Sequence, residues 1–237
     1  MPSPNPVLSA GGSAVRRLGR AVARGRRGRA LHPDGVVLPG VLAVDASSRR
    51  PLGIDVFDEP GRTGVTVRLS RATSLPRPLP DVLGLALRIP GGAGHGRDLD
   101  LLLSTCGRWP GADRLLWPRT SFTAGPYSTL AAYRHPRGRV RLVAVPDGPA
   151  LPADPGRLRR ALARGPLTFH LLAAPAGGRP WRLATLTVHD GPPMPDVAFD
   201  PVVNGHPALR MAGWLRRLRR EAYAGSRQGR DAPPPSR

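Results

Sequence analysis

The sequence predicts a mainly β protein of the α+β class, in which eight short strands form a closed barrel or a sandwich and a helix follows them. From about residue 31 to residue 189, short apolar or alternating runs are separated by Gly, Pro and Asp, which is the pattern of strands and turns. Eight such runs at this spacing are typical of barrels and sandwiches. After Pro195 the pattern becomes helical, so we expect the helix at the C-terminal end.

The eight expected strands are apolar or alternating runs that lie between turn signals. They are residues 36–44, 65–70, 83–89, 99–104, 128–133, 140–145, 167–173 and 183–189.

Two helices are expected. Residues 155–164 form a short helical insert, because Leu158 and Leu162 lie four positions apart on one face. Residues 208–226 form the main helix, which begins after Pro207, a residue suited to the first turn. Its apolar stripe has the spacing i, i+3 and i+7. The stripe consists of Leu215, Leu218 and Ala222.

The charge of the chain is strongly positive. There are 36 basic and 16 acidic residues, a net charge of +20, and every basic residue is arginine. Arginine without lysine, in a chain rich in Ala, Gly and Pro, points to a compositional bias that accounts for part of the charge. A charge of this size would still attract phosphate, anionic lipid or carboxylate ligands.

Both ends of the chain differ in composition from the middle. Residues 1–28 are interpreted as a basic arm, because arginines are frequent there and acids are absent. No apolar run follows that could form the core of a signal peptide. Residues 229–237 are rich in Pro and Arg, and we expect a disordered tail. One folded domain would then occupy residues 29–228.

Cysteine content and hydropathy suggest the compartment. Cys106 is the single cysteine, so an intrachain disulfide is excluded and a reducing cytoplasm is the default expectation. We interpret Cys106 as a small buried apolar residue rather than a thiolate ligand. No run of 18 apolar residues occurs, and no membrane span is expected.

Two segments at opposite ends of the chain carry a motif. The first is Arg29-Ala-Leu-His32-Pro-Asp-Gly35, followed by Gly40, and the second is Arg219-Arg-Glu-Ala-Tyr223. Together they resemble the Arg-x-x-His and Arg-x-x-x-Tyr patterns of the catalase family. This resemblance implies an eight-stranded antiparallel catalase-like β-barrel, whose C-terminal helix carries the iron ligand.

Three segments between them extend the resemblance in the same order. Val67-Arg68-Leu69-Ser70 is similar to the Val-Arg-Phe-Ser strand of the family. The segment 80–88 (PDVLGLALR) resembles its Asp-x-x-Gly hairpin, and 100–105 (DLLLST) resembles its Asp-Leu-Val-Gly-Asn-Asn strand. The resemblance spans about residues 29–226, although between residues 107 and 196 only the strand character matches.

Tyr223 is the expected iron ligand of haem b. A neutral phenol, with a pKa near 10, binds iron poorly at neutral pH, so the ligand must be ionised. Arg219 lies one helical turn earlier on the same face, where its guanidinium would favour the phenolate. Taken alone, Tyr223 on such a helix is more often a core residue.

The other face of the haem would carry the peroxide chemistry. His32 can move a proton between the two peroxide oxygens, since it titrates near neutral pH. The resemblance places Ser70 beside His32, and assigns Arg29 and Arg68 to the haem propionates. It also places Thr105 where catalases have an asparagine that orients peroxide. The threonine hydroxyl is shorter and cannot donate as an amide does.

The expected function is that of a haem-dependent oxidoreductase, which uses hydrogen peroxide or an organic hydroperoxide with a small organic co-substrate. The alternative from another class is a basic nucleic-acid-binding or scaffold protein on a catalase-like barrel without haem. The net charge of +20 supports this alternative. Aromatic residues are only 5% of the chain, which does not favour base stacking. The sequence leaves open whether the chain forms a homo-oligomer.

Overall fold

The computed structural model describes most of the chain between residues 34 and 211. The described residues are 34–46, 50–73, 76, 78–108, 112–136, 138–192, 194–195 and 197–211. The expected arm (1–28) and tail (229–237) lie outside them. So do four of the expected site residues, which are Arg29, His32, Arg219 and Tyr223.

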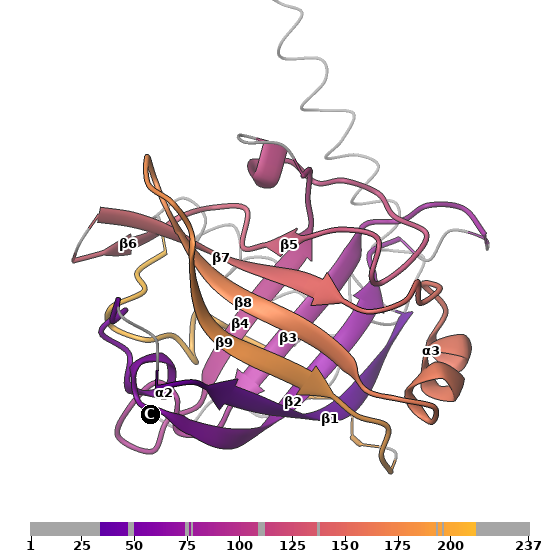
Figure 1. The fold of residues 1–237 in the computed structure, drawn as a ribbon, viewed down its shortest axis with the longest axis horizontal. Helices are drawn as coiled ribbons and strands as arrows, with labels where there is room; N and C mark the ends of the chain where they lie inside the picture. Colours follow the sequence, from indigo (N-terminus) through magenta and orange to yellow (C-terminus); the bar gives the residue numbers. More distant parts are fainter. Residues whose placement is uncertain are drawn as a thin grey trace, which may run out of the picture.

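The described residues form a closed antiparallel β-barrel (Figure 1). The eight strands of the ring are β1 (Asp34–Val44), β2 (Gly61–Arg71), β3 (Leu83–Ile89), β4 (Leu99–Thr105), β5 (Tyr127–Ser128), β7 (Gly138–Asp147), β8 (Leu167–Pro175) and β9 (Trp181–Val188). Their order around the ring is β5-β4-β3-β2-β1-β9-β8-β7, and pairing of β5 with β7 closes it. The short strand β6 (Tyr133–His135) extends the sheet by pairing with β7. The prediction of an eight-stranded antiparallel barrel is confirmed.

Every second side chain along the strands is apolar and points inwards, and these side chains fill the interior of the barrel. In β1, Val36 and Leu38 are buried in the core, and Leu69 and Val67 of β2, which lie opposite them, are fully buried. Phe57 and leucines of β3, β4, β7, β8 and β9 line a cavity of about 10 Å³. Such a cavity has room for about one water molecule. A cofactor would therefore have to bind on the outer face of this barrel.

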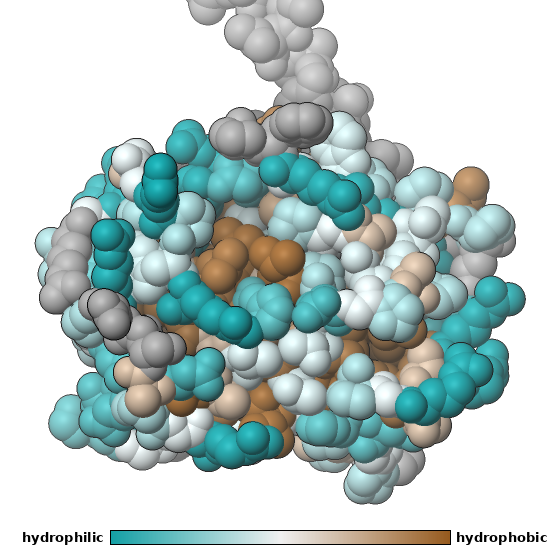
Figure 2. All heavy atoms as spheres, viewed as in Figure 1, coloured by the Kyte–Doolittle hydropathy of each residue, from teal (hydrophilic) through white to brown (hydrophobic). Residues whose placement is uncertain are grey.

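The outer face carries both polar and apolar side chains. On the side shown in Figure 2, apolar residues gather near β7 and hydrophilic residues surround them. Val143 of β7 and Leu172 of β8, which pair with each other, are half-buried.

The helix predicted at residues 155–164 is confirmed as α3 (Pro155–Leu162). Asp154 caps it, because its carboxylate accepts a hydrogen bond from the Arg157 N–H at 2.9 Å. Leu158 and Leu162 are buried, as the four-residue spacing predicts. Two shorter elements were not predicted. They are the helix α2 (Asp55–Asp58) and the 3-10 helix η1 (Ala112–Arg114).

The helix predicted at 208–226 does not begin where the sequence suggests. The first four residues of this range are not helical, and Arg210 instead pairs with Arg134 in an isolated β-bridge. The prediction was wrong for these residues because a tertiary backbone pairing overrides local helix propensity. The remainder of the range lies outside the described residues. In the part of the chain that the structure describes, no helix is long and apolar enough to cross a membrane.

A carboxylate on β4 holds the segment that precedes this bridge. The Asp100 carboxylate pairs with the Arg88 guanidinium at 2.7 Å, and it also accepts hydrogen bonds from the Asp200 N–H and the Asn204 side chain. Arg88 in turn donates to the Ala198 carbonyl. The hydrogen bond to Asp100 raises the pKa of Arg88. These bonds fasten residues 198–204 to the outer face of β3 and β4.

Candidate functional site

Four small residues line up across the outer face of β1, β2, β3 and β4. In the strand registers Gly35 lies opposite Ser70, Ser70 opposite Gly84, and Gly84 opposite Ser104. Residues that lie directly opposite each other share a face of the sheet. These four positions, which we call the small-residue row, present two hydroxyl groups and two glycines on one surface.

A second row lies beside the first on the same face, and each of its members is two residues away from a member of the first row on the same strand. It consists of Val37, Arg68, Ala86 and Leu102. The exposed fractions of Val37 and Arg68 are only 6%, and that of Ala86 is 9%, although these side chains face away from the barrel interior. Together the two rows form a surface of small and apolar side chains that holds one buried cation.

The guanidinium of Arg68 lies over Gly35 on the neighbouring strand. A Cβ atom added at Gly35 would lie 2.8 Å from both Cζ and Nη2 of Arg68, and 2.8 Å from the Leu69 carbonyl oxygen. Real Cβ atoms do not approach other atoms so closely, so a side chain at this position would displace the guanidinium. Gly35 of the first motif and Arg68 of the Val67-Arg68-Leu69-Ser70 segment are therefore linked by packing.

This contact leads to a testable expectation. Gly35→Ala should displace the Arg68 guanidinium and weaken binding of a carboxylate-bearing ligand by about 10-fold, the worth of one charge-assisted hydrogen bond. The measurement is a haem titration followed by the Soret absorbance. Gly64→Ala is the matched control, because a Cβ at Gly64 on β2 meets no atom within 4 Å. Equal haem affinity in the two variants would refute a role for this contact.

The structure does not bring Thr105 onto the same face as Ser70. Thr105 follows Leu103 by two residues, shares its face and points into the barrel, where its hydroxyl accepts a hydrogen bond from the Leu83 N–H at 3.0 Å. It is 1% exposed. The residue of β4 that shares the face of Ser70 is Ser104, which is half-buried. Ser104 was not singled out from the sequence, and the signal that identifies it is the strand register.

Cys106 lies two residues beyond Ser104 and is fully buried. Its Sγ donates to the Pro126 carbonyl at 3.4 Å. Burial raises the pKa of the Cys106 thiol to about 11. The group is therefore a neutral thiol at neutral pH, which agrees with its interpretation as a small apolar residue.

Of the seven expected site residues, the structure describes three and brings two of them together. Arg68 and Ser70 lie on one face of β2. Thr105 lies on the opposite face, and Arg29, His32, Arg219 and Tyr223 are outside the described residues. Among the described residues, no group of three or more His, Cys, Asp or Glu side chains is placed to hold a metal ion.

The fold defines the class of protein as a closed, mainly β antiparallel barrel. Among solved structures, its architecture is similar to that of a fungal catalase, with a TM-score of 0.60 and 13% identity over 86% of this chain and 60% of the catalase. It is also similar to a bacterial catalase, with a TM-score of 0.59 and 13% identity over 86% of this chain and 57% of that one. The chain therefore has a catalase-like fold and spans less than two thirds of either catalase. No family model and no curated protein sequence match it.

Proposed function

We propose that this protein is a haem-dependent oxidoreductase that reduces hydrogen peroxide or an organic hydroperoxide and oxidises a small organic co-substrate. The observation that carries the proposal is the outer surface of β1–β4, where the small-residue row lies beside the buried Arg68. The catalase-like fold supports the same conclusion. The haem domain would comprise residues 29–228, in a cytoplasm that keeps Cys106 reduced.

The described residues fit one face of a haem. A planar macrocycle needs a surface without large protruding side chains, and Gly84 and Ala86 would provide one, next to the Arg68 guanidinium that lies over Gly35. An arginine is a favourable partner for a haem propionate, and Arg68, which is 6% exposed, would take this role. When bound, haem b would supply the iron that accepts electrons from the organic substrate and passes them to peroxide.

The residues of this chain would hold the reactants and move the proton. We assign Tyr223 to the iron, Arg219 to stabilising its phenolate, and Arg29 with Arg68 to the propionates. His32 would take the proton from one peroxide oxygen and deliver it to the other. Ser70 would hold one imidazole nitrogen of His32, so that the second nitrogen faces the peroxide.

We assign to Ser104 the role that the sequence suggests for Thr105. It lies on the face of Ser70, two strands away, whereas the Thr105 hydroxyl is used inside the barrel. Serine lacks the amide N–H donors of asparagine, so it would orient hydrogen peroxide less firmly. We therefore infer a peroxidase-like reaction rather than rapid disproportionation of hydrogen peroxide.

The test of the proposal is haem binding by the full chain. Wild-type protein reconstituted with haem should show a high-spin ferric Soret band, and Tyr223→Phe should lose it, because phenylalanine has no oxygen to bind iron. The chain has three tyrosines, and Tyr127→Phe is the matched control. Tyr127 is fully buried in the barrel interior, where its hydroxyl donates to the Phe122 carbonyl, so this variant should keep the band. A wild-type protein without a Soret band would end the proposal.

The arrangement of charge gives the nucleic-acid alternative less support. Several of the described arginines are engaged in ion pairs at separate places on the fold. Arg71 pairs with Asp81, Arg88 with Asp100, and Arg141 with Asp113. A scaffold for phosphate binding would leave such cations free to face the backbone of the nucleic acid.

A further inference from the structure

Three consecutive apolar side chains project from the loop after η1. Leu115, Leu116 and Trp117 are 60%, 52% and 49% exposed. They lie in an exposed stretch that runs from Arg114 to Pro118. We call Leu115, Leu116 and Trp117 the apolar loop. Single exposed leucines are common on protein surfaces, whereas an adjacent set with a tryptophan marks an interaction site.

The backbone of the apolar loop is fixed by hydrogen bonds to the end of β4. The Trp117 N–H donates to the Thr105 carbonyl at 2.9 Å, and Leu116 forms a β-bridge with Cys106. Arg119, just beyond the loop, pairs with Asp81 in a second bridge. The three side chains are therefore held outwards by a defined backbone.

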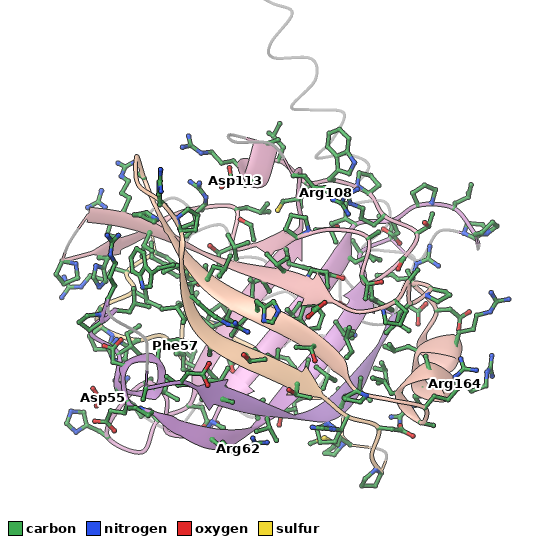
Figure 3. The ribbon with its side chains drawn as sticks, in the orientation of Figure 1. Asp55, Phe57, Arg62, Arg108, Asp113 and Arg164 are labelled. Atoms are coloured by element: carbon green, nitrogen blue, oxygen red, sulfur yellow. The ribbon has the colours of Figure 1, made fainter. Side chains whose placement is uncertain are left out.

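The charge around the apolar loop is basic. Arg108 and Arg114 are exposed, and Arg108 is close enough to Arg119 to help lower the pKa of Arg119, after the larger effect of burial. Asp113 is the one acid among residues 112–119, and its carboxylate is paired with Arg141 of β7. Figure 3 shows Arg108 and Asp113 at the same end of the barrel. The exposed charges beside the apolar side chains are thus arginines.

We propose that the apolar loop is a membrane-binding element that inserts into the surface of a bilayer containing anionic lipid. Leucine side chains would enter the boundary between headgroups and acyl chains, and the Trp117 ring would lie at the headgroup level. The neighbouring Arg108 and Arg114 would contact lipid phosphates. The net charge of +20 would draw the whole chain to the same surface.

Two other partners fit these residues less well. Nucleic acid would use the arginines and the ring of Trp117, but it offers nothing to Leu115 and Leu116. A second copy of this chain would bring another charge of +20 to the interface, and three side chains are few for a stable dimer. An anionic bilayer satisfies both the apolar and the basic groups.

This surface lies next to the candidate site. Leu116 pairs with Cys106, two residues beyond Ser104 of the small-residue row. The membrane-binding proposal itself does not depend on haem, so it is tested separately.

The experiment measures sedimentation of the full chain with vesicles of phosphatidylcholine alone and of equal parts phosphatidylcholine and phosphatidylglycerol. Wild-type protein should bind the anionic vesicles. The combined variant Leu115→Ser, Leu116→Ser and Trp117→Ser should bind them at least about 10-fold more weakly, since burial of one leucine alone is worth about that factor. Val203→Ser is the matched control, because Val203 is 48% exposed in another part of the fold.

A second variant reports insertion directly and does not depend on the stability of the triple variant. Tryptophan fluorescence of the wild type should shift to the blue on anionic vesicles, and Trp117→Phe should still bind but lose most of that shift. Equal vesicle binding by the wild type and the triple variant would overturn the proposal, because net charge alone would then explain adsorption. Two other results would also overturn it. In the first, the triple variant binds vesicles as the wild type does but no longer binds duplex DNA; in the second, it binds vesicles normally but no longer forms a dimer that the wild type forms.

Discussion

The His32→Ala variant is expected to bind haem as the wild type does and to turn over peroxide about 10²- to 10⁴-fold more slowly, which is the usual contribution of a general acid–base group. Alanine removes the group that would move the proton between the peroxide oxygens, but leaves the iron ligand untouched. The measurement is the steady-state rate with hydrogen peroxide and with an organic hydroperoxide. Added imidazole should restore part of the rate if the missing group is a proton carrier.

The control for His32→Ala is a substitution at a histidine outside the candidate site. His95 is exposed in the turn between β3 and β4, and its positive φ of 54° is a conformation that asparagine also tolerates. His95→Asn should therefore leave both haem content and turnover unchanged. Turnover by His32→Ala at the wild-type rate would refute the acid–base assignment while leaving haem binding intact.

The barrel could be predicted from the sequence because its strands alternate cleanly. In β2, Val65, Val67 and Leu69 point inwards, and the sequence of residues 65–70 shows this alternation directly. Turn residues between the runs mark where each strand ends. Closure into a barrel rather than a sandwich could not be read in this way, since it depends on the two-residue strand β5, which pairs with both β4 and β7.

The candidate site shows the limit of reasoning from motifs. Ser70 and Arg68 were singled out by the resemblance of Val67-Arg68-Leu69-Ser70 to a catalase strand. Their two-residue spacing places them on one face whatever the partner strands do. Which residue of β4 shares the face of Ser70 depends on the register between the strands, and the sequence does not specify that register. A shift of one residue moves a side chain to the other face of the sheet. The resemblance matched Thr105 to the catalase asparagine, whereas in the structure Ser104 is the residue of β4 that shares the face of Ser70.

Tertiary contacts explain the elements that were not predicted. Helix α2 is only four residues long, and it is held by the Asp58 carboxylate, which accepts hydrogen bonds from the backbone N–H groups of Leu52, Gly53 and Ile54. A four-residue helix has no periodicity that a sequence pattern could reveal. Similarly, Arg210 takes part in a bridge with Arg134, a residue distant in sequence, within a segment whose local preference is helical.

Asp100→Ala is expected to lower the free energy of unfolding by about 3 kcal/mol, the lower end of the range for breaking a buried ion pair. The side chain of Asp100 is fully buried, whereas that of Arg88 is 20% exposed. Water can therefore solvate part of the Arg88 guanidinium after Asp100 is removed. The substitution also removes the acceptor for the Asp200 N–H and the Asn204 side chain. Residues 198–204 should then detach from the outer face of β3 and β4 more readily.

Thermal and urea unfolding followed by circular dichroism measure this loss, which corresponds to a fall in Tm of about 6–12 °C in a chain of this size. Asp98→Ala removes the same functional group from a second carboxylate that faces Arg88, but at 3.8 Å and with 39% of the Asp98 side chain exposed. An exposed pair of this kind contributes at most about 1 kcal/mol. If the two variants unfold at the same urea concentration, Asp100 does not fasten residues 198–204. A loss confined to Asp100→Ala, together with faster proteolysis within 198–204, would show that a single carboxylate holds this segment against the barrel.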